Sequence, residues 1–326
     1  MNLAEAVAQP RNLSRDAMVR LLAAEDPAEI EALFAAARAV REKCSRTAVL
    51  PRGLIECSNV CAKDCRYCGI RKSNPALARY TLTEAEVREC LDEARRRGYP
   101  AVAFQAGEIE SEANTAYYER LLAASRDFEV TLSLGEQTEE VYRRWKDAGA
   151  MRYLIRIETS NRELYAKIHP AECSFERRLG CIRTLKRLGY VTGSGVMIGL
   201  PGQTVEDLAR DIVFYGEENL DMVGMGPYVP NGDTPLGTQV EVEGGGGQWN
   251  GNVPLSTSTF DLALRMIALT RLYLWDVNIV AATALGALDP ENGLRRGIEA
   301  GANVAMPELT PAAHAGDYVL YPRMRK

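Results

Sequence analysis

Short apolar runs alternate with amphipathic segments along almost the whole chain from Gly53 onward. Eight of the apolar runs have the length and composition of strands, and the segments between them have the spacing of apolar residues that is typical of helices. This alternation favours parallel strands with helices packed outside them. Eight such units are what a TIM barrel needs. The sequence therefore predicts an α/β fold, a complete (β/α)8 barrel.

The predicted elements follow one another with short connections. The strands are expected at residues 53–57, 101–105, 130–134, 153–157, 192–198, 222–225, 278–281 and 303–305. The helices are expected at residues 84–97, 116–126, 138–148, 175–188, 205–219, 259–273 and 290–300. Four helices are followed by a glycine, which tolerates the positive φ of a helix C-cap: Gly98, Gly149, Gly189 and Gly301.

The segment before the alternation is helical in character. Ser14 can cap one helix, and Asp26-Pro27 can begin another that is rich in Ala, Glu and Arg. No catalytic pattern occurs here. We therefore expect an N-terminal helical extension at residues 1–48, followed by the barrel at residues 49–326.

Composition excludes several classes of protein. Apolar residues make up 46% and charged residues 25% of the chain, as in ordinary globular proteins. The net charge of −5 and the absence of basic clusters, apart from Arg95-Arg96-Arg97 at a predicted helix end, argue against nucleic acid as a partner. No signal peptide or long apolar span is evident, so we predict a cytoplasmic protein with no membrane partner and with reduced cysteines.

Three cysteines lie on one short segment that follows the first predicted strand. Cys61, Cys65 and Cys68 are spaced so that three thiolates can ligate three irons of a [4Fe-4S] cluster and leave the fourth iron open. Zinc is the alternative, but structural zinc sites usually close with a second pair of ligands. The chain has only two histidines, His169 and His314, neither of them in a paired motif, and no second CxxC.

The spacing of this segment, CxxxC-x-aromatic-C, resembles that of the radical S-adenosylmethionine (SAM) enzymes. The resemblance implies that SAM binds the open iron through its amino and carboxylate groups. It also implies that Tyr67, the residue before the last cysteine, packs near the adenine. A [4Fe-4S] cluster and SAM are therefore the expected cofactors, with Cys61, Cys65 and Cys68 as metal ligands.

Polar residues at the ends of later strands complete this prediction. Gly107-Glu108 resembles the motif that receives the SAM amino group, where a glycine lets the ligand approach the backbone. Arg156 and Glu158, two apart in a predicted strand, would share a face, either as a structural salt bridge or with Glu158 on the SAM ribose or amino group and Arg156 on a substrate carboxylate. Arg178 is the expected partner of the SAM carboxylate. Met197 lies in a segment that resembles the strand beside the adenine.

The resemblance extends to one group within this superfamily, which contains HydE, biotin synthase and PylB, and it is strongest to HydE, the [FeFe]-hydrogenase maturase. It is carried by the segments 53–61, 131–136, 193–204, 221–227, 233–236 and 301–307. It implies a full radical SAM barrel with an internal cavity. In HydE the implied substrate is a small cysteine-bound iron carbonyl cyanide species, which the 5′-deoxyadenosyl radical attacks at sulfur.

Carried over by motif, Thr131, Arg156, Met222 and Tyr321 would line the substrate cavity. The expected partners are a small amino-acid-derived or thiol-bearing substrate, such as the hydrogenase precursor, and a one-electron reductant such as flavodoxin or ferredoxin. Two alternatives stay open: a PylB-like mutase that rearranges an amino-acid skeleton, and a non-catalytic carrier of SAM or of the cluster.

Some positions depart from the HydE pattern. Ile157 and Val196 stand where that group typically has His and Ser, and each change removes a polar group near the barrel mouth. Residues 244–252 form a glycine-rich segment without apolar periodicity. It favours a mobile surface loop, and the alternative is a lid gated by Trp249.

Overall fold

Eight parallel strands form the centre of the computed structural model, which describes residues 8–44, 47–242, 257–314 and 316–320. In sheet order, the strands are β10, β1, β2, β3, β4, β5, β7 and β9. Their bounds are β1 Leu50–Ser58, β2 Ala101–Ala106, β3 Glu129–Ser133, β4 Arg152–Leu154, β5 Val191–Ser194, β7 Met222–Val223, β9 Asn278–Ile279 and β10 Val304–Ala305. Neighbouring strands follow one another in sequence, so the predicted barrel is confirmed.

The barrel closes at a seam between β9 and β10. A parallel bridge joins Val280 to Val304 there. The backbone N–H of Asn303 donates to the carbonyl oxygen of Ile279 at 2.9 Å, and the N–H of Ala281 donates to that of Val304 at 2.9 Å. By contrast, β1 pairs with β2 from Arg52 to Ser58. The ladder is therefore long on one side of the barrel and short at the seam.

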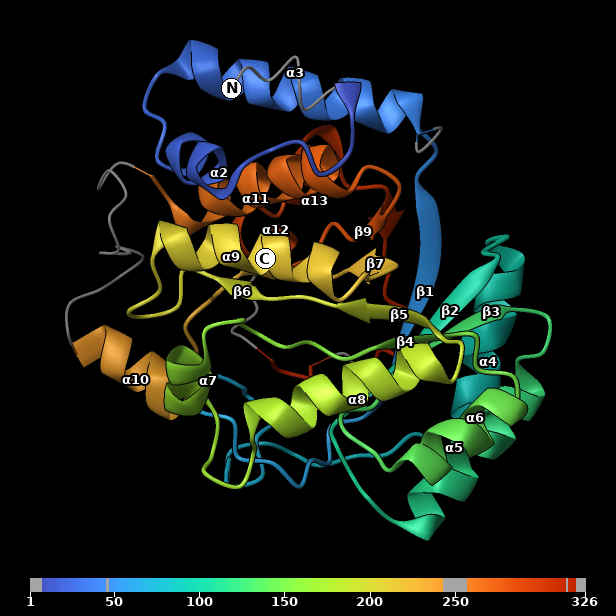
Figure 1. The fold of residues 1–326 in the computed structure, drawn as a ribbon. Helices are drawn as coiled ribbons and strands as arrows, with labels where there is room; N and C mark the ends of the chain where they lie inside the picture. The colour runs from blue at the N-terminus through green and yellow to red at the C-terminus, as the bar shows by residue number, and fades with distance from the viewer. Residues whose placement is uncertain (1–7, 45–46, 243–256, 315, 321–326) are drawn as a thin grey trace.

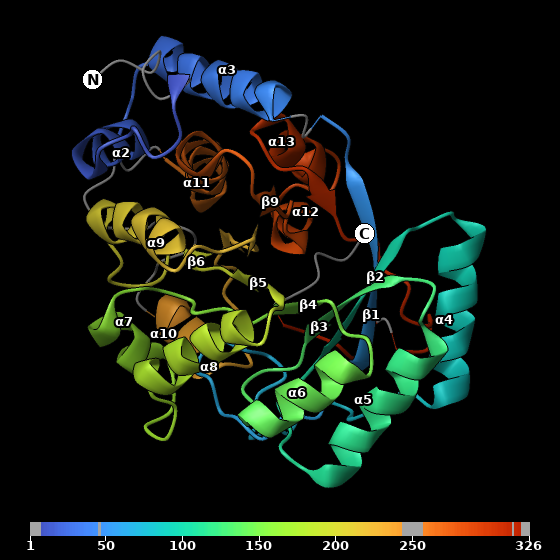
Figure 2. The same ribbon diagram turned by 45° about the vertical axis from the view of Figure 1, so that its right-hand side comes forward.

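Helices surround the strands, as the two views of Figures 1 and 2 show. Those that follow strands in the predicted order are α4 Glu84–Arg96, α5 Glu112–Ala124, α6 Glu139–Asp147, α8 Phe175–Arg187, α9 Val205–Glu217, α11 Thr259–Leu274 and α13 Gly293–Glu299. Three further helices were not predicted: α7 Arg162–Ile168, α10 Pro235–Val242 and α12 Thr283–Leu288. They have six to eight residues, too few for a helical period to stand out in a sequence.

Two helices precede the barrel in the part of the chain that the structure describes. In α2 (Arg15–Leu22) and α3 (Pro27–Lys43), the side chains of Ser14 and Asp26 accept the N-terminal capping bonds. Both helices pack on α11, and α2 also packs on α9. Arg265 of α11 donates from Nη1 to the carbonyl oxygen of Leu22 at 2.6 Å, which satisfies one of the last carbonyls of α2. None of the helices described in this structure is both long and apolar enough to cross a membrane.

Side chains alternate between the two faces of each strand. Ile55, Phe104 and Leu132 belong to the hydrophobic core between strands and helices. Their neighbours Leu54, Ala103 and Thr131, which are paired in register across β1, β2 and β3, therefore face the inside of the barrel.

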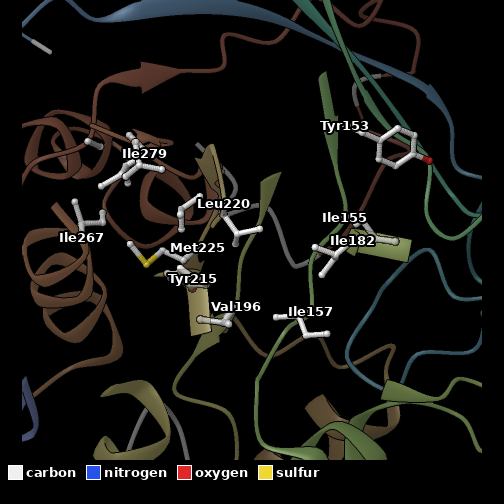
Figure 3. Packing of buried hydrophobic residues seen from close by; sticks show 14 of the residues in the cluster. Tyr153, Ile155, Ile157, Ile182, Val196, Tyr215, Leu220, Met225, Ile267 and Ile279 are labelled. Carbon is white, nitrogen blue, oxygen red and sulfur yellow. The ribbon is translucent and has the colours of Figure 1, made fainter. Parts of the chain in front are cut away.

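Two positions that depart from the HydE pattern lie in this outer core. Ile157 and Val196 are fully buried among apolar side chains, and Figure 3 shows them near one another and near Tyr215. The polar groups expected there are thus replaced by packing contacts.

The prediction for residues 192–198 needs one refinement. The segment divides into β5 and a second short strand, β6 (Met197–Ile198), which pairs with β8 (Gly226–Pro227) in a separate two-stranded sheet. Residues 244–252, for which a loop or a lid was expected, lie outside the described residues.

Candidate active site

The cysteine segment leaves the C-terminal end of β1, where a TIM barrel carries its active site. Cys61, Cys65 and Cys68 are free and partly exposed. The Cys61 sulfur accepts hydrogen bonds from the backbone N–H of Lys63 at 3.4 Å and of Glu108 at 3.3 Å. Such donors stabilise negative charge on a sulfur. The segment is thus prepared to hold at least one thiolate.

Gly107 lets the cysteine segment pack against the end of β2. A Cβ atom at this position would lie 2.2 Å from the carbonyl oxygen of Val60 and 2.7 Å from the Cβ of Cys61. Any larger residue would push the first cysteine away. The glycine of the Gly107-Glu108 motif therefore has a packing role in this structure, in addition to the ligand approach predicted for it.

Burial keeps the three thiols protonated in the absence of a cation. It raises the pKa of Cys61 and Cys65, and it raises the pKa of Cys68 to about 12. Coordination to iron reverses this preference, because a metal-bound thiol loses its proton. Within the described residues, no three Cys, His, Asp or Glu side chains converge as ligands of a single metal ion. A cluster instead takes one thiolate per iron.

A buried ion-pair network surrounds Arg178. Its Nε lies 2.6 Å from Oε1 of Glu136, and its Nη2 lies 3.9 Å from Oε2 of Glu108. Its Nη1 donates to the carbonyl oxygen of Arg156 at 2.7 Å. Two of the nitrogens of Arg178 are thus occupied by protein partners, and Nη2 is the one with the longest contact. The predicted role of Arg178 on the SAM carboxylate would therefore use that nitrogen.

Glu108 and Glu136 are linked through the backbone as well. The N–H of Glu136 donates to Oε2 of Glu108 at 2.8 Å, and Lys63 lies 3.1 Å from Oε1 of Glu108. Gly135, at φ 74°, makes room for this contact, because a Cβ there would lie 2.3 Å from Oε2 of Glu108. Burial still raises the pKa of Glu108. The carboxylates are held by neighbours on three loops.

Arg156 and Glu158 lie beyond the end of β4, which stops at Leu154. They are paired, with Nη2 of Arg156 2.9 Å from Oε2 of Glu158. The geometry is not that of a hydrogen bond, and within the described part of the chain neither Nε of Arg156 nor Oε2 of Glu158, both buried, has a hydrogen-bond partner. Burial raises the pKa of Glu158. The predicted salt bridge is thus formed, and the two side chains still have polar atoms that a ligand could bind.

Glu158 adopts a left-handed backbone conformation, with φ 66°. This conformation is strained for a residue with a side chain. Hydrogen bonds to the next strand hold it in place: the N–H of Glu158 donates to the carbonyl oxygen of Gly195 at 3.0 Å, and the N–H of Met197 donates to that of Glu158 at 3.0 Å. The predicted adenine segment therefore fixes the position of the predicted ribose or amino ligand.

Tyr67 and Met197 meet in a small apolar cluster that is separate from the main core. Its buried members are Leu164, Ile168, Met197, Leu200, Tyr228 and Leu236, and Tyr67 packs against them. The cluster brings together α7, β6 and α10, which lie side by side in Figures 1 and 2. An apolar, aromatic surface is suited to a flat heterocycle such as adenine.

The predicted substrate residues lie deeper in the barrel. Thr131 is buried, and its Oγ1 has no hydrogen-bond partner among the described residues. The Met222 sulfur accepts a contact from Nη1 of Arg52 at 3.1 Å. Tyr321 lies outside the described residues. Thr131 and Met222 thus share the barrel interior with Arg52.

Sequence reasoning missed several residues of this region, notably Glu136, Lys63, Arg52 and His169. Glu136 follows β3 directly, so the rule that strand ends carry the site could have found it. Arg52 lies within the first half of β1, where an arginine gave no signal. Lys63 and His169 act through tertiary contacts that no local pattern reveals.

Comparison with known proteins identifies the family of the chain. The model of the radical SAM superfamily matches residues 55–214. HydE of Thermotoga maritima, a subunit of the [FeFe] hydrogenase maturase, is 41% identical over 96% of this chain and 85% of its own length. The chain belongs to the radical SAM superfamily.

Two other relatives are more distant. The 3-methylornithine synthase of Methanosarcina acetivorans is 25% identical over 92% of this chain and 81% of its own length. The crystal structure of methylornithine synthase (PylB) superposes with a TM-score of 0.82 at 22% identity, covering 99% of this chain and 91% of that one. The second likeness establishes the shared fold.

Membership makes the protein a radical SAM enzyme, and enzymes of this superfamily use a [4Fe-4S] cluster and SAM. The residues present fit both groups. Three soft thiol donors occupy one segment, and cysteine thiolates are the usual cluster ligands. Buried, unpartnered atoms of Arg156 and Glu158 offer complementary charges to a zwitterionic ligand.

Proposed function

We propose that this enzyme is HydE-like and acts on a small amino-acid-derived or thiol-bearing molecule inside the barrel, in the maturation of [FeFe] hydrogenase. The observation that supports this most is the 41% identity to the HydE maturase, which spans 96% of the chain rather than the cluster segment alone. The polar residues of the barrel interior give the proposal its chemistry.

In this proposal the C-terminal ends of the strands hold the cofactors. Cys61, Cys65 and Cys68 ligate the cluster. When bound, cluster and SAM supply one-electron cleavage of a carbon–sulfur bond, which yields methionine and the 5′-deoxyadenosyl radical. The residues assigned to SAM are Tyr67 and Met197 for the adenine, Glu158 for the ribose or amino group, Gly107 and Glu108 for the amino group, and Nη2 of Arg178 for the carboxylate.

The substrate residues point to an anion. Arg156 binds a carboxylate, and Thr131 donates its otherwise unused hydroxyl to it. Arg52 adds a second guanidinium in the interior, with no carboxylate within ion-pair distance among the described residues. Met222, which Arg52 contacts, lines the same wall, and Tyr321 is assigned to it by motif. An amino acid or a cysteine-bound species has the carboxylate that this set requires.

The barrel wall protects the reaction from side reactions. A primary carbon radical reacts with nearby C–H bonds, so the cavity must exclude water and mobile side chains. Gly193 of β5 lets the side chains of Leu154 and Met222 pack tightly: a Cβ there would lie 2.8 Å from Cδ1 of Leu154 and 3.0 Å from Cβ of Met222. The rigid backbone of parallel strands keeps the cavity in shape.

Reconstituted protein with a chemical reductant tests the first step. We expect methionine and 5′-deoxyadenosine to form from SAM, with flavodoxin or ferredoxin able to replace the chemical reductant. Failure of the iron-loaded protein to cleave SAM would instead support a non-catalytic carrier of SAM or of the cluster.

A PylB-like mutase is the second candidate. It is favoured by the 25% identity to 3-methylornithine synthase over 92% of the chain. Deuterated amino acids and cysteine-derived candidates separate the two: a mutase transfers deuterium into 5′-deoxyadenosine, whereas attack at sulfur gives an adduct of substrate and adenosyl group without label transfer. Mass spectrometry of the products distinguishes these outcomes.

A further inference from the structure

Helix α7 connects the loop of Glu158 to the cysteine segment. It begins after Asn161, whose Nδ2 donates to Oδ1 of Asp207 on α9 at 2.9 Å and whose Oδ1 caps the helix. At its other end, the carbonyl oxygen of Ile168 accepts the N–H of Arg66 at 2.9 Å. Arg66 lies between two of the three cysteines. One short helix therefore spans the distance between two predicted SAM contacts.

His169 ends this helix and is buried, with 3% of its surface exposed. Its Nε2 lies 3.2 Å from the hydroxyl of Tyr67, and its Nδ1 lies 3.0 Å from the carbonyl oxygen of Tyr165. Its ring stacks on Tyr165, with centroids 3.8 Å apart and an interplanar angle of 20°. The edge of the Tyr67 ring completes the enclosure, at 5.4 Å and 83°.

These contacts define which ring nitrogen carries the proton. A carbonyl oxygen can only accept, so Nδ1 donates to Tyr165. Burial, reinforced by the nearby Arg178 charge, lowers the pKa of His169 to about 3, so the ring is neutral at physiological pH. Nε2 is then an acceptor, and the hydroxyl of Tyr67 donates to it. The Tyr67 side chain also lies within hydrogen-bond reach of the Glu158 carboxylate, so it stands between His169 and Glu158.

We propose that His169 is a positioning residue, which fixes the Tyr67 ring against α7 and so holds the cysteine segment and the Glu158 loop at a constant separation. The inference rests on the proposed roles of Tyr67 and Glu158 in SAM binding. A ring whose hydroxyl is anchored loses less conformational freedom when adenine packs on it, and affinity improves with such preorganisation. His169 itself need not touch SAM.

Histidine-labelled protein tests the contact without any reaction. The chain has two histidines, so 15N-histidine labelling gives only two imidazole rings to assign. We expect one ring to stay neutral, with the proton on Nδ1, down to about pH 4. In Tyr67→Phe the Nε2 resonance of this ring should shift. An unchanged Nε2 resonance would overturn the proposal.

SAM binding tests the consequence. His169→Phe and Tyr67→Phe should each weaken the affinity for SAM roughly 3- to 10-fold, the effect of one neutral hydrogen bond. The double variant should be no weaker than Tyr67→Phe, because that change already removes the bond between Tyr67 and His169. His169→Gln, which retains an acceptor and a donor, should restore most of the affinity.

His314 provides the matched control. Its ring stacks on Tyr80 at 4.4 Å and 14°, so His314→Phe perturbs a similar stack without touching Tyr67. We expect its SAM affinity and its iron content to match those of the wild type. Equal losses in His314→Phe and His169→Phe, or additive losses in the double variant, would refute a specific role for His169. If the wild type binds no SAM, the proposed function fails, and the labelling experiment still decides the contact.

Discussion

The rim of the barrel and its interior differ in whether buried charged and polar side chains are paired. At the rim, formed by Glu108, Glu136, Arg156, Glu158 and Arg178, every charged side chain lies within 4 Å of an opposite charge. In the interior, among the residues that the structure describes, Arg52 donates to the sulfur of Met222 and forms no ion pair, and Oγ1 of Thr131 has no hydrogen-bond partner. Paired charges hold a fixed geometry, whereas unpaired polar groups need a ligand. The rim thus has a fixed arrangement of charges, and the interior keeps the polar groups that we propose for substrate.

Removal of the three cysteines should have the largest effect on activity, because the chemistry at the rim depends on the cluster. The triple change of Cys61, Cys65 and Cys68 to Ala should abolish iron and sulfide incorporation and all SAM cleavage. Iron and sulfide analysis after anaerobic reconstitution measures this. Cys90→Ala, at a buried thiol of α4, is the control and should retain the full iron content. Equal iron in both variants would contradict the assignment.

Arg178→Met should lower the free energy of unfolding by about 3 kcal/mol, because it removes a buried partner of Glu136 and Glu108. Arg177 and Lys63 remain as partners of these carboxylates and limit the loss. Urea denaturation measures the change. Arg183→Met is the control on the same helix: its pair with Glu218 is solvent-exposed on the arginine side, and its loss should cost less than about 1 kcal/mol. Similar losses in both variants would mean that the rim network does not stabilise the fold.

Asp211 of α9 is a buried acid near the rim that forms no ion pair among the described residues. Its Oδ1 accepts the N–H of Ser160 at 2.7 Å, and burial raises its pKa to about 7. The unfolded chain releases this proton near pH 4, so the contribution of Asp211 to stability is full below pH 4 and is lost as the pH rises to 7.

In the wild type, Asp211 should lower the free energy of unfolding by up to about 1.4 kcal/mol per pH unit as the pH rises from 4 to 7. Asp211→Asn should remove this pH dependence. Denaturation of both proteins at several pH values gives the difference between their unfolding free energies. This difference contains the contribution of Asp211 but not that of His169, which both proteins share. The pKa of His169 is lowered to about 3, so it acts in the opposite direction: stability rises with pH from 3 to 6.5. A constant difference across this range would show that Asp211 is ionised throughout.

Arg52→Met should raise the free energy of unfolding, whereas Arg178→Met should lower it. Burial lowers the pKa of Arg52 to about 10, which indicates that its charge is costly in the folded protein. We expect the unfolding free energy to rise by about 1 kcal/mol, while the KM for the substrate increases. A loss of stability would mean that Arg52 supports the barrel wall.

Thr131→Val should change stability least, because the two side chains have the same shape and the lost hydroxyl has no partner. The unfolding free energy should remain within about 0.5 kcal/mol of the wild type, in keeping with such a swap. SAM cleavage without substrate should be unchanged, and only the substrate KM should rise. A decrease in uncoupled SAM cleavage would place Thr131 at the rim rather than in the interior.

The sequence revealed the order of the strands and the cysteine segment because both are local patterns. It misplaced Arg156 and Glu158 within a strand, although β4 ends at Leu154 and Glu158 adopts a left-handed conformation. It also did not predict Glu136 as the partner of Arg178, since the two residues are 42 positions apart and meet only in the folded barrel. Which charges pair is decided by tertiary packing, which leaves little trace in local periodicity.

The seam between β9 and β10 should open locally more readily than the pairing of β1 with β2. Local opening costs least where few backbone hydrogen bonds must break, and the backbone bonds near Ile279 and Val304 are far fewer than those between β1 and β2. Amide protons of residues 279–281 and 303–304 should exchange with deuterium before those of β1. In an enzyme that must be sealed during a radical reaction and open before it, the pairing of β1 with β2 can stay intact while the seam, one strand away from β1, opens.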